Sequence, residues 1–264
     1  MQRRKLLQMA AGLAAAPMVA TAMADDRRSG LTFVLVHGAW HGGWCWAPLA
    51  RELQAKGHRV TTPTLTGLGE RAHLLSPGVE LGTHIMDVVN HIDAEEMNNI
   101  VLVGHSYGGF VVRGVSDKRA ETISHIVYLD AFVPNDGEAV IDYTPKERAQ
   151  MIRDTIARDP AGTAPPPNAA AFGVKDAGQI EWVNRRMTPH PLRTYLQPLA
   201  LTSRADSIRS RNYIACLSPK LDVFDSTRDR IRTDSGWRYL ELQHGHDVMV
   251  TAPEVLAQTL LSLV

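Results

Sequence analysis

The chain has 264 residues, of which 44% are hydrophobic and 21% are charged. This length and composition are typical of a globular protein with a sizeable buried core, and they exclude a fibrous or largely disordered chain. Its 28 basic and 28 acidic residues give a formal net charge of zero, so no overall positive charge favours binding to nucleic acid or to an anionic membrane.

Residues 1–24 are typical of an export signal. Three cations at positions 3–5 precede the apolar stretch 6–22, and Ala-Met-Ala at 22–24 supplies the small residues that a signal peptidase recognises. The pair Arg3-Arg4 resembles a twin-arginine signal, which would imply a bacterial protein exported to the periplasm or secreted. A Sec signal or an uncleaved anchor is the alternative, although Pro17 disfavours stable membrane insertion.

After this segment, short β-rich runs alternate with helical patterns. That alternation predicts an α/β fold, with a mostly parallel twisted sheet covered by helices on both faces. The expected strands are 32–36, 59–62, 100–103, 126–129, 213–216 and 237–242, and the expected helices are 46–56, 83–95 with Thr83 as N-cap, 110–117 and 253–261.

Residues 134–208 interrupt the alternation. They contain the run Pro165–Pro167 and two helical patterns, at 146–158 and 180–187. An insertion of this size between two strands is better interpreted as a lid over the active face than as a separate domain, although Pro-rich segments also serve as spacers. The predicted organisation is a core of 25–133 and 209–264 with a lid at 134–208.

Ser106 is the candidate nucleophile. It lies in Gly104-His105-Ser106-Tyr107-Gly108, between an apolar strand and a helix. A tight strand–turn–helix holds a hydroxyl clear of the sheet, and small residues two positions before and after it let the backbone pass.

His246 is the candidate base, because it lies in a turn between the last strand and the last helix, where the base follows in this fold. His244 is the competitor, but the adjacent Gly245 indicates a turn and favours His246. The acid is less determined. Asp130 closes an apolar strand, which is costly without a partner, whereas Asp222 follows the later strand 213–216; Asp130 is preferred and Asp222 remains the alternative.

An oxyanion hole needs two backbone N–H groups. We expect these at Tyr107, directly after the nucleophile, and at Ala39, in the loop after the first strand. His37 is expected to brace that loop. The candidate residues for a substrate pocket are Trp40, His105, Phe132 and Trp182.

The two cysteines, Cys45 and Cys216, are expected to be buried thiols, although an export compartment would permit a bridge. No Cys-x-x-Cys motif or His/Cys cluster indicates a metal site, and no cofactor is expected. The oligomeric state is open.

These motifs resemble those of the α/β-hydrolases related to plant methylesterases and hydroxynitrile lyases, with bacterial esterase relatives. The resemblance rests on residues 33–44 (Phe-Val-Leu-Val-His-Gly-Ala-Trp-His-Gly-Gly-Trp), on the Ser106 turn, and on 245–247 (Gly-His-Asp) before 251–253 (Thr-Ala-Pro). It implies the α/β-hydrolase fold, the triad order and the oxyanion hole given above. Some relatives place the acid at the position of Asp130.

The resemblance also frames the alternatives. The lyase branch has a Thr where this chain has Gly38, a carboxylate where it has His105, and a Lys where it has Asp247. A cation at the last position would stabilise departing cyanide, whereas Asp247 would repel it. The leading hypothesis is therefore a serine esterase that cleaves carboxylic esters of small or medium apolar or aromatic substrates. The alternatives are lyase-like carbon–carbon cleavage at the same site and a non-catalytic small-molecule-binding protein.

Overall fold

The computed structural model describes residues 30–264. The expected export signal, residues 1–24, lies outside the described residues. Within residues 30–264, no helix has both the length and the apolar character needed to cross a membrane.

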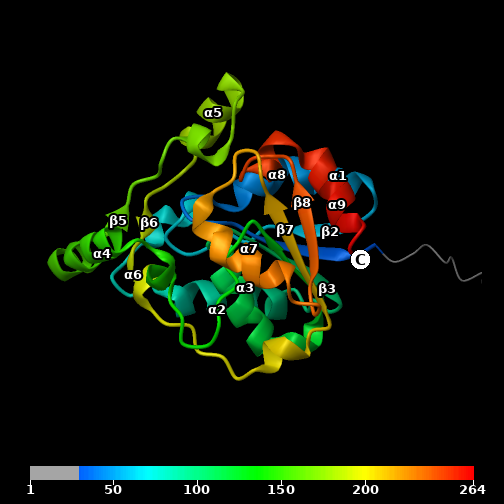
Figure 1. The fold of residues 1–264 in the computed structure, drawn as a ribbon, viewed down its shortest axis with the longest axis horizontal. Coiled ribbons are helices and arrows are strands. Elements are labelled where there is room, and N and C mark those ends of the chain that lie inside the picture. Colours follow the sequence, from blue (N-terminus) through cyan, green and yellow to red (C-terminus); the bar gives the residue numbers. More distant parts are fainter. Residues whose placement is uncertain (1–29) are drawn as a thin grey trace, which may run out of the picture.

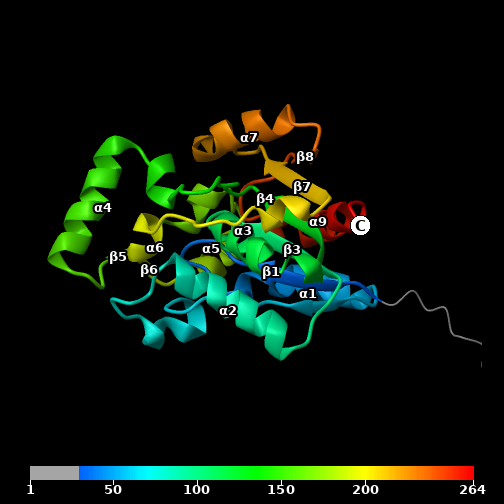
Figure 2. The same ribbon diagram turned by 90° about the horizontal axis from the view of Figure 1, so that it is seen from below.

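A six-stranded parallel sheet with the order β2-β1-β3-β4-β7-β8 forms the centre of the fold. Figures 1 and 2 show helices on both of its faces. The predicted α/β architecture is thereby confirmed. The strands are β1 (Thr32–Val36), β2 (Arg59–Thr61), β3 (Ile100–His105), β4 (Ile123–Leu129), β7 (Ser210–Cys216) and β8 (Arg238–Leu242).

Alternate residues of β1 enter two separate cores. Val34 and Val36 are fully buried in one, and Phe33 and Leu35 in the other. Because both faces of this strand are buried, its sequence is a continuous apolar run. The first core is covered by α2 (Leu81–Ala94), α3 (Gly108–Lys118) and α7 (Asp225–Arg232), and the second by α1 (Ala47–Ala55), α8 (Val248–Thr251) and α9 (Pro253–Leu261).

Helix α2 begins earlier than predicted. Its N-cap is Glu80, whereas the sequence predicted Thr83. Thr83 occupies the third helical position, and its hydroxyl accepts a hydrogen bond from the Glu80 N–H at 3.3 Å. The N-cap prediction was wrong because a side chain inside the first turn can also satisfy a free amide, by reaching back to the cap.

Residues 134–208 connect β4 to β7. They form α4 (Lys146–Arg158), α5 (Ala177–Asn184), α6 (Arg193–Leu196) and the short antiparallel pair of β5 (Thr163–Ala164) and β6 (His190–Pro191). The helix predicted at 146–158 is confirmed, and the one predicted at 180–187 is shifted toward the N-terminus. Figure 1 shows α4 and α5 standing out from the sheet.

Candidate active site

Ser106 lies at the carboxyl end of β3, in a tight turn that leads into α3. Its φ of +56° is a left-handed conformation that residues other than glycine rarely adopt. A Cβ at Gly104 would lie 2.5 Å from Val112 Cγ2, and a Cβ at Gly108 would lie 2.8 Å from the His37 carbonyl oxygen. The two glycines therefore permit the strained turn that holds the Ser106 hydroxyl clear of the sheet.

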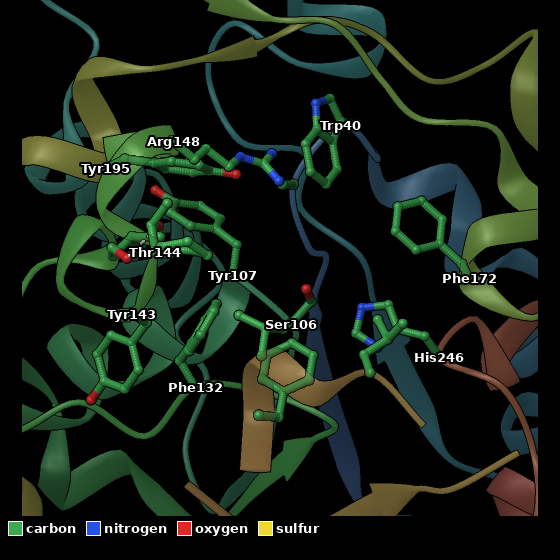
Figure 3. A pocket seen from close by; sticks show the side chains of 16 residues that line it. Trp40, Ser106, Tyr107, Phe132, Tyr143, Thr144, Arg148, Phe172, Tyr195 and His246 are labelled. Carbon is green, nitrogen blue, oxygen red and sulfur yellow. Dashed lines mark hydrogen bonds between the residues drawn. The ribbon is translucent and has the colours of Figure 1, made fainter. Parts of the chain in front are cut away.

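His246 lies in the turn between β8 and α8 and is 2% exposed. Its Nδ1 is 2.7 Å from Asp130 Oδ2. A carboxylate only accepts, so Nδ1 carries the hydrogen and Nε2 is left as an acceptor. Ser106 and His246 line one cavity, and Figure 3 shows the Ser106 hydroxyl directed into it beside the His246 ring. His244 does not line this cavity.

Asp130 is fully buried at the end of β4, with a φ of +41°. Its Oδ1 accepts a hydrogen bond from the Cys216 N–H at 3.2 Å and lies 3.9 Å from the buried Arg228 guanidinium. These partners offset the cost of burying its charge. The side chain of Asp222, by contrast, is 85% exposed. The structure thus brings Asp130, and not Asp222, to His246.

Ala39 and Tyr107 line the same cavity as Ser106. Both residues are buried, yet neither N–H donates a hydrogen bond to any of the residues 30–264. Buried amides are rarely left without a partner. Tyr107 is also the N-cap of α3, where the helix dipole favours negative charge. Both amides are therefore free to bind an oxyanion.

The loop that carries Ala39 is braced by His37, as predicted. His37 Nδ1 donates to the Gly38 carbonyl oxygen at 2.8 Å, and Nε2 accepts from the Leu65 N–H at 3.1 Å. Burial lowers the pKa of His37 to about 3, so the ring stays neutral and keeps this donor–acceptor arrangement.

The cavity has a volume of about 190 Å³, many times the roughly 10–15 Å³ that one water needs by this measure. Its walls are mostly aromatic, and α4 adds the guanidinium of Arg148 at the rim (Figure 3). The aromatic lining residues are Trp40, Tyr107, Phe132, Tyr143, Phe172, Tyr195 and Phe224. Such a space suits a small, mainly apolar molecule.

Two of the four expected pocket residues line this cavity, Trp40 and Phe132, and two do not. The His105 side chain lies beneath His246, and its Nε2 donates to the His246 carbonyl oxygen at 3.1 Å. Trp182 packs against Trp44, with ring centroids 5.1 Å apart. The prediction of both was wrong because each aromatic ring is used for packing away from the Ser106 hydroxyl.

Sequence reasoning missed the part of the wall that residues 134–208 supply. This insertion contains the lining residues Tyr143, Arg148, Phe172 and Tyr195, of which Arg148 lies in the first turn of α4. Aromatic residues in an otherwise polar, Pro-rich segment were the available signal. Their direction could not be read, because an irregular segment has no period that assigns side chains to a face.

Cys45 and Cys216 are free and fully buried, as expected. Burial raises the pKa of both thiols, so neither is a reactive thiolate. Among residues 30–264, no group of three or more His, Cys, Asp or Glu side chains is arranged to hold a metal ion.

One known protein resembles this chain along most of its length, and others resemble it over about half. It is 44% identical to the carbendazim hydrolyzing esterase of Nocardioides sp. (strain SG-4G), over 88% of this chain and 98% of that protein. It is 33% identical to salicylic acid-binding protein 2 of Nicotiana tabacum, over 48% of this chain and 51% of that protein. Methylesterase 10 of Arabidopsis thaliana is 33% identical over 50% of this chain and 46% of that protein.

The fold is likewise similar to that of a solved extracellular alpha/beta-hydrolase from a Paenibacillus species. The TM-score is 0.76 at 27% identity, covering 88% of this chain and 98% of that one. The sequence pattern of the alpha/beta hydrolase family matches residues 33–259, which include the Ser106 turn, Asp130 and His246. The chain therefore belongs to the alpha/beta hydrolase family, and it is a hydrolase of the esterase type.

Proposed function

We propose that the protein hydrolyses carboxylic esters through an acyl-enzyme formed on Ser106. The Ser106 hydroxyl attacks the ester carbonyl while His246 Nε2 takes its proton, and His246 then gives that proton to the departing alcohol. The amides of Ala39 and Tyr107 hold the oxyanion. Water, activated by His246, then releases the acid. The carrying observation is the 2.7 Å bond from His246 to Asp130, which leaves Nε2 free to accept at the cavity that Ser106 lines.

The substrates we propose are esters of small or medium size with an aromatic or apolar group. The aromatic walls and the volume of about 190 Å³ support this, because aromatic rings pack favourably on one another. The likeness to a carbendazim hydrolyzing esterase supports flat aromatic methyl carbamates as one such class. Residues 134–208 act as the lid, since their aromatic side chains close the cavity over Ser106.

A panel of purified-enzyme assays tests this substrate class. We expect a kcat/KM roughly two- to tenfold higher for a methyl ester of an aromatic acid than for a branched aliphatic ester of similar volume, since one aromatic pair contributes about 0.5–1.5 kcal/mol. Carbendazim is included as a flat carbamate. Ser106→Ala is the matched control and should be inactive on every ester. Preference for aliphatic esters, or for amides, would contradict the proposed class.

The lyase alternative lacks a supporting observation. A Cβ at Gly38 would lie 2.8 Å from Ser106 Cβ, so a Thr at this position, as in the lyase branch, would displace the nucleophile. The Asp247 carboxylate is buried against His41 and does not line the cavity. The position still offers no cation for departing cyanide. Cyanide release from a cyanohydrin, dependent on Ser106, would favour the lyase.

We also propose that the protein is exported to the periplasm or secreted, on the basis of the twin-arginine-like pattern in residues 1–24. Expressed in a bacterial host, the full chain should place esterase activity outside the cytoplasm, and Arg3→Lys with Arg4→Lys should retain it inside. Fractionation followed by N-terminal sequencing measures this. Export that persists in the double variant would favour a Sec signal instead.

A further inference from the structure

His41 and Asp247 form a buried pair beneath the reaction site. His41 Nε2 lies 3.2 Å from Asp247 Oδ2, across 206 residues of sequence, and the two side chains are 2% and 0% exposed. Trp44 stacks on the His41 ring, with centroids 5.3 Å apart. His41 follows Ala39 in the loop after β1, and Asp247 directly follows His246. The pair therefore joins the segment with a proposed oxyanion amide to the segment with the proposed base.

Both ring nitrogens of His41 face oxygen atoms that accept hydrogen bonds. Nδ1 lies 2.8 Å from the Ala39 carbonyl oxygen, and Nε2 faces the Asp247 carboxylate. A neutral imidazole has one N–H and would direct a lone pair at one of these oxygens. Both contacts are satisfied when the ring holds a second proton. The imidazolium and the carboxylate are then neutral as a pair, which burial favours over a lone carboxylate.

Four other titratable side chains packed near the pair are uncharged. Burial lowers the pKa of His37 to about 3. Burial also lowers the pKa of His105, whose ring centroid is 6.3 Å from that of His41. Burial raises the pKa of the thiols of Cys45 and Cys216, which both lie within the field of Asp247. Asp247 thus has His41 as its partner for charge in this part of the core.

The same contacts favour the protonated form of His41. Burial alone would lower the pKa of His41, but the charge and the hydrogen bond of Asp247 outweigh it and raise the pKa above 6.5. Because the folded-state pKa is raised, the stabilisation is fully present below pH 6.5 and is lost as pH rises through the raised value.

We propose that His41 and Asp247 are positioning residues whose shared proton holds the Ala39 amide toward Ser106 and thereby sets an alkaline limit to catalysis. This rests on the proposed hydrolysis at Ser106. The Asp247 backbone is fixed, because its N–H donates to the Phe172 carbonyl oxygen at 3.1 Å. When the second proton leaves, the ring keeps the N–H that faces the carboxylate, and the Nδ1 lone pair then faces the Ala39 carbonyl oxygen. These two acceptors repel, and the loop that carries Ala39 is released.

Two substitutions at Asp247 test this. In Asp247→Asn the amide can donate to Nε2 of a neutral His41, so the bridge persists without an ionisable proton. In Asp247→Ala the bridge is lost. With an activated aryl ester, we expect Asp247→Ala to lower kcat by roughly 10–100-fold, less than the loss of an oxyanion donor outright, with KM changed by less than about threefold. Asp247→Asn should recover most of that loss.

The pH profile of kcat between pH 6 and 10 is the decisive measurement. The wild-type enzyme should lose activity on the alkaline side, and Asp247→Asn should lack this fall. An alkaline fall that persists unchanged in Asp247→Asn would overturn the proposal, as would equal losses in the Asn and Ala variants. If Asp247→Ala does not fold, the pH profile of kcat for Asp247→Asn, compared with that of the wild type, still tests the proposal.

A separate readout distinguishes this failure from failure of the proposed function. Labelling by an organophosphate reports whether Ser106 is an activated nucleophile. If the wild-type enzyme is labelled at Ser106 while the Asp247 variants behave as wild type across the pH range, only the positioning role is rejected. If the wild-type enzyme is not labelled, the proposed hydrolysis itself is rejected.

Discussion

Replacing Ser106 with Ala is expected to lower kcat on an activated aryl ester by on the order of 10⁶, the size of loss that accompanies removal of the nucleophile in a triad enzyme. No other hydroxyl can substitute, because among the residues lining the cavity Ser106 alone lies in the strained turn beside the free amides of Ala39 and Tyr107. The residual rate should reflect binding and the oxyanion hole only. Stopped-flow or end-point release of the aryl alcohol measures it.

The same variant should keep its fold, since Ala retains the Cβ of Ser106 and the backbone N–H at this position still donates to the Leu129 carbonyl oxygen. An unchanged denaturation midpoint is therefore the control for Ser106→Ala. A loss of less than tenfold in kcat with the fold intact would reject Ser106 as the nucleophile. A burst of aryl alcohol in the wild type, absent in the variant, would independently support the acyl-enzyme.

The second large effect concerns the acid. Asp130→Asn is expected to lower kcat by about 10⁴, because an amide in this position can donate to His246 Nδ1 and hold the ring as the tautomer with hydrogen on Nε2. Nε2 then points a hydrogen, and not a lone pair, toward the Ser106 hydroxyl. Steady-state kinetics with the same aryl ester measures the loss, and KM should change far less than kcat.

Asp222→Asn is the matched control for this experiment, as it makes the same chemical change at an exposed side chain. The Asp222 carboxylate lies 3.3 Å from the Lys220 ammonium in an exposed ion pair, and exposed ion pairs contribute little to stability. Its kcat should remain within about twofold of wild type. The reverse order, with Asp222→Asn inactive and Asp130→Asn active, would assign the acid to Asp222, and near-normal activity in both would mean that the triad is incomplete.

Much of the sheet could be predicted from the sequence because its strands are buried on both faces. The run 100–103 is wholly apolar, and it ends at the small and polar residues that form the Ser106 turn. Strand β4 was recognised only from residue 126, although it begins at Ile123, because Ser124 and His125 interrupt the apolar run. Hydrophobic patterns identify the buried part of a strand but do not reveal its partly exposed end.

Helix α7 was not predicted because its sequence, Asp-Ser-Thr-Arg-Asp-Arg-Ile-Arg, has almost no apolar face. Among its buried residues, Ile231 is the single aliphatic one, and Arg228 is buried through its contacts with Asp225 and Asp130. This helix is held by charged contacts to residues far away in the sequence, and a short stretch of sequence does not reveal such contacts. For the same reason, the approach of Asp130 to His246 could be offered only as one of two alternatives.

The division between the sheet and residues 134–208 has an evolutionary consequence. The reacting groups lie at the ends of strands, where the six-stranded sheet fixes them. Much of the cavity wall belongs instead to residues 134–208, between β4 and β7. Selection can therefore remodel that segment and alter which compounds are degraded, while the bond-breaking apparatus is inherited intact. Related proteins would then differ in the substrates that they accept before they differ in the reaction that they catalyse.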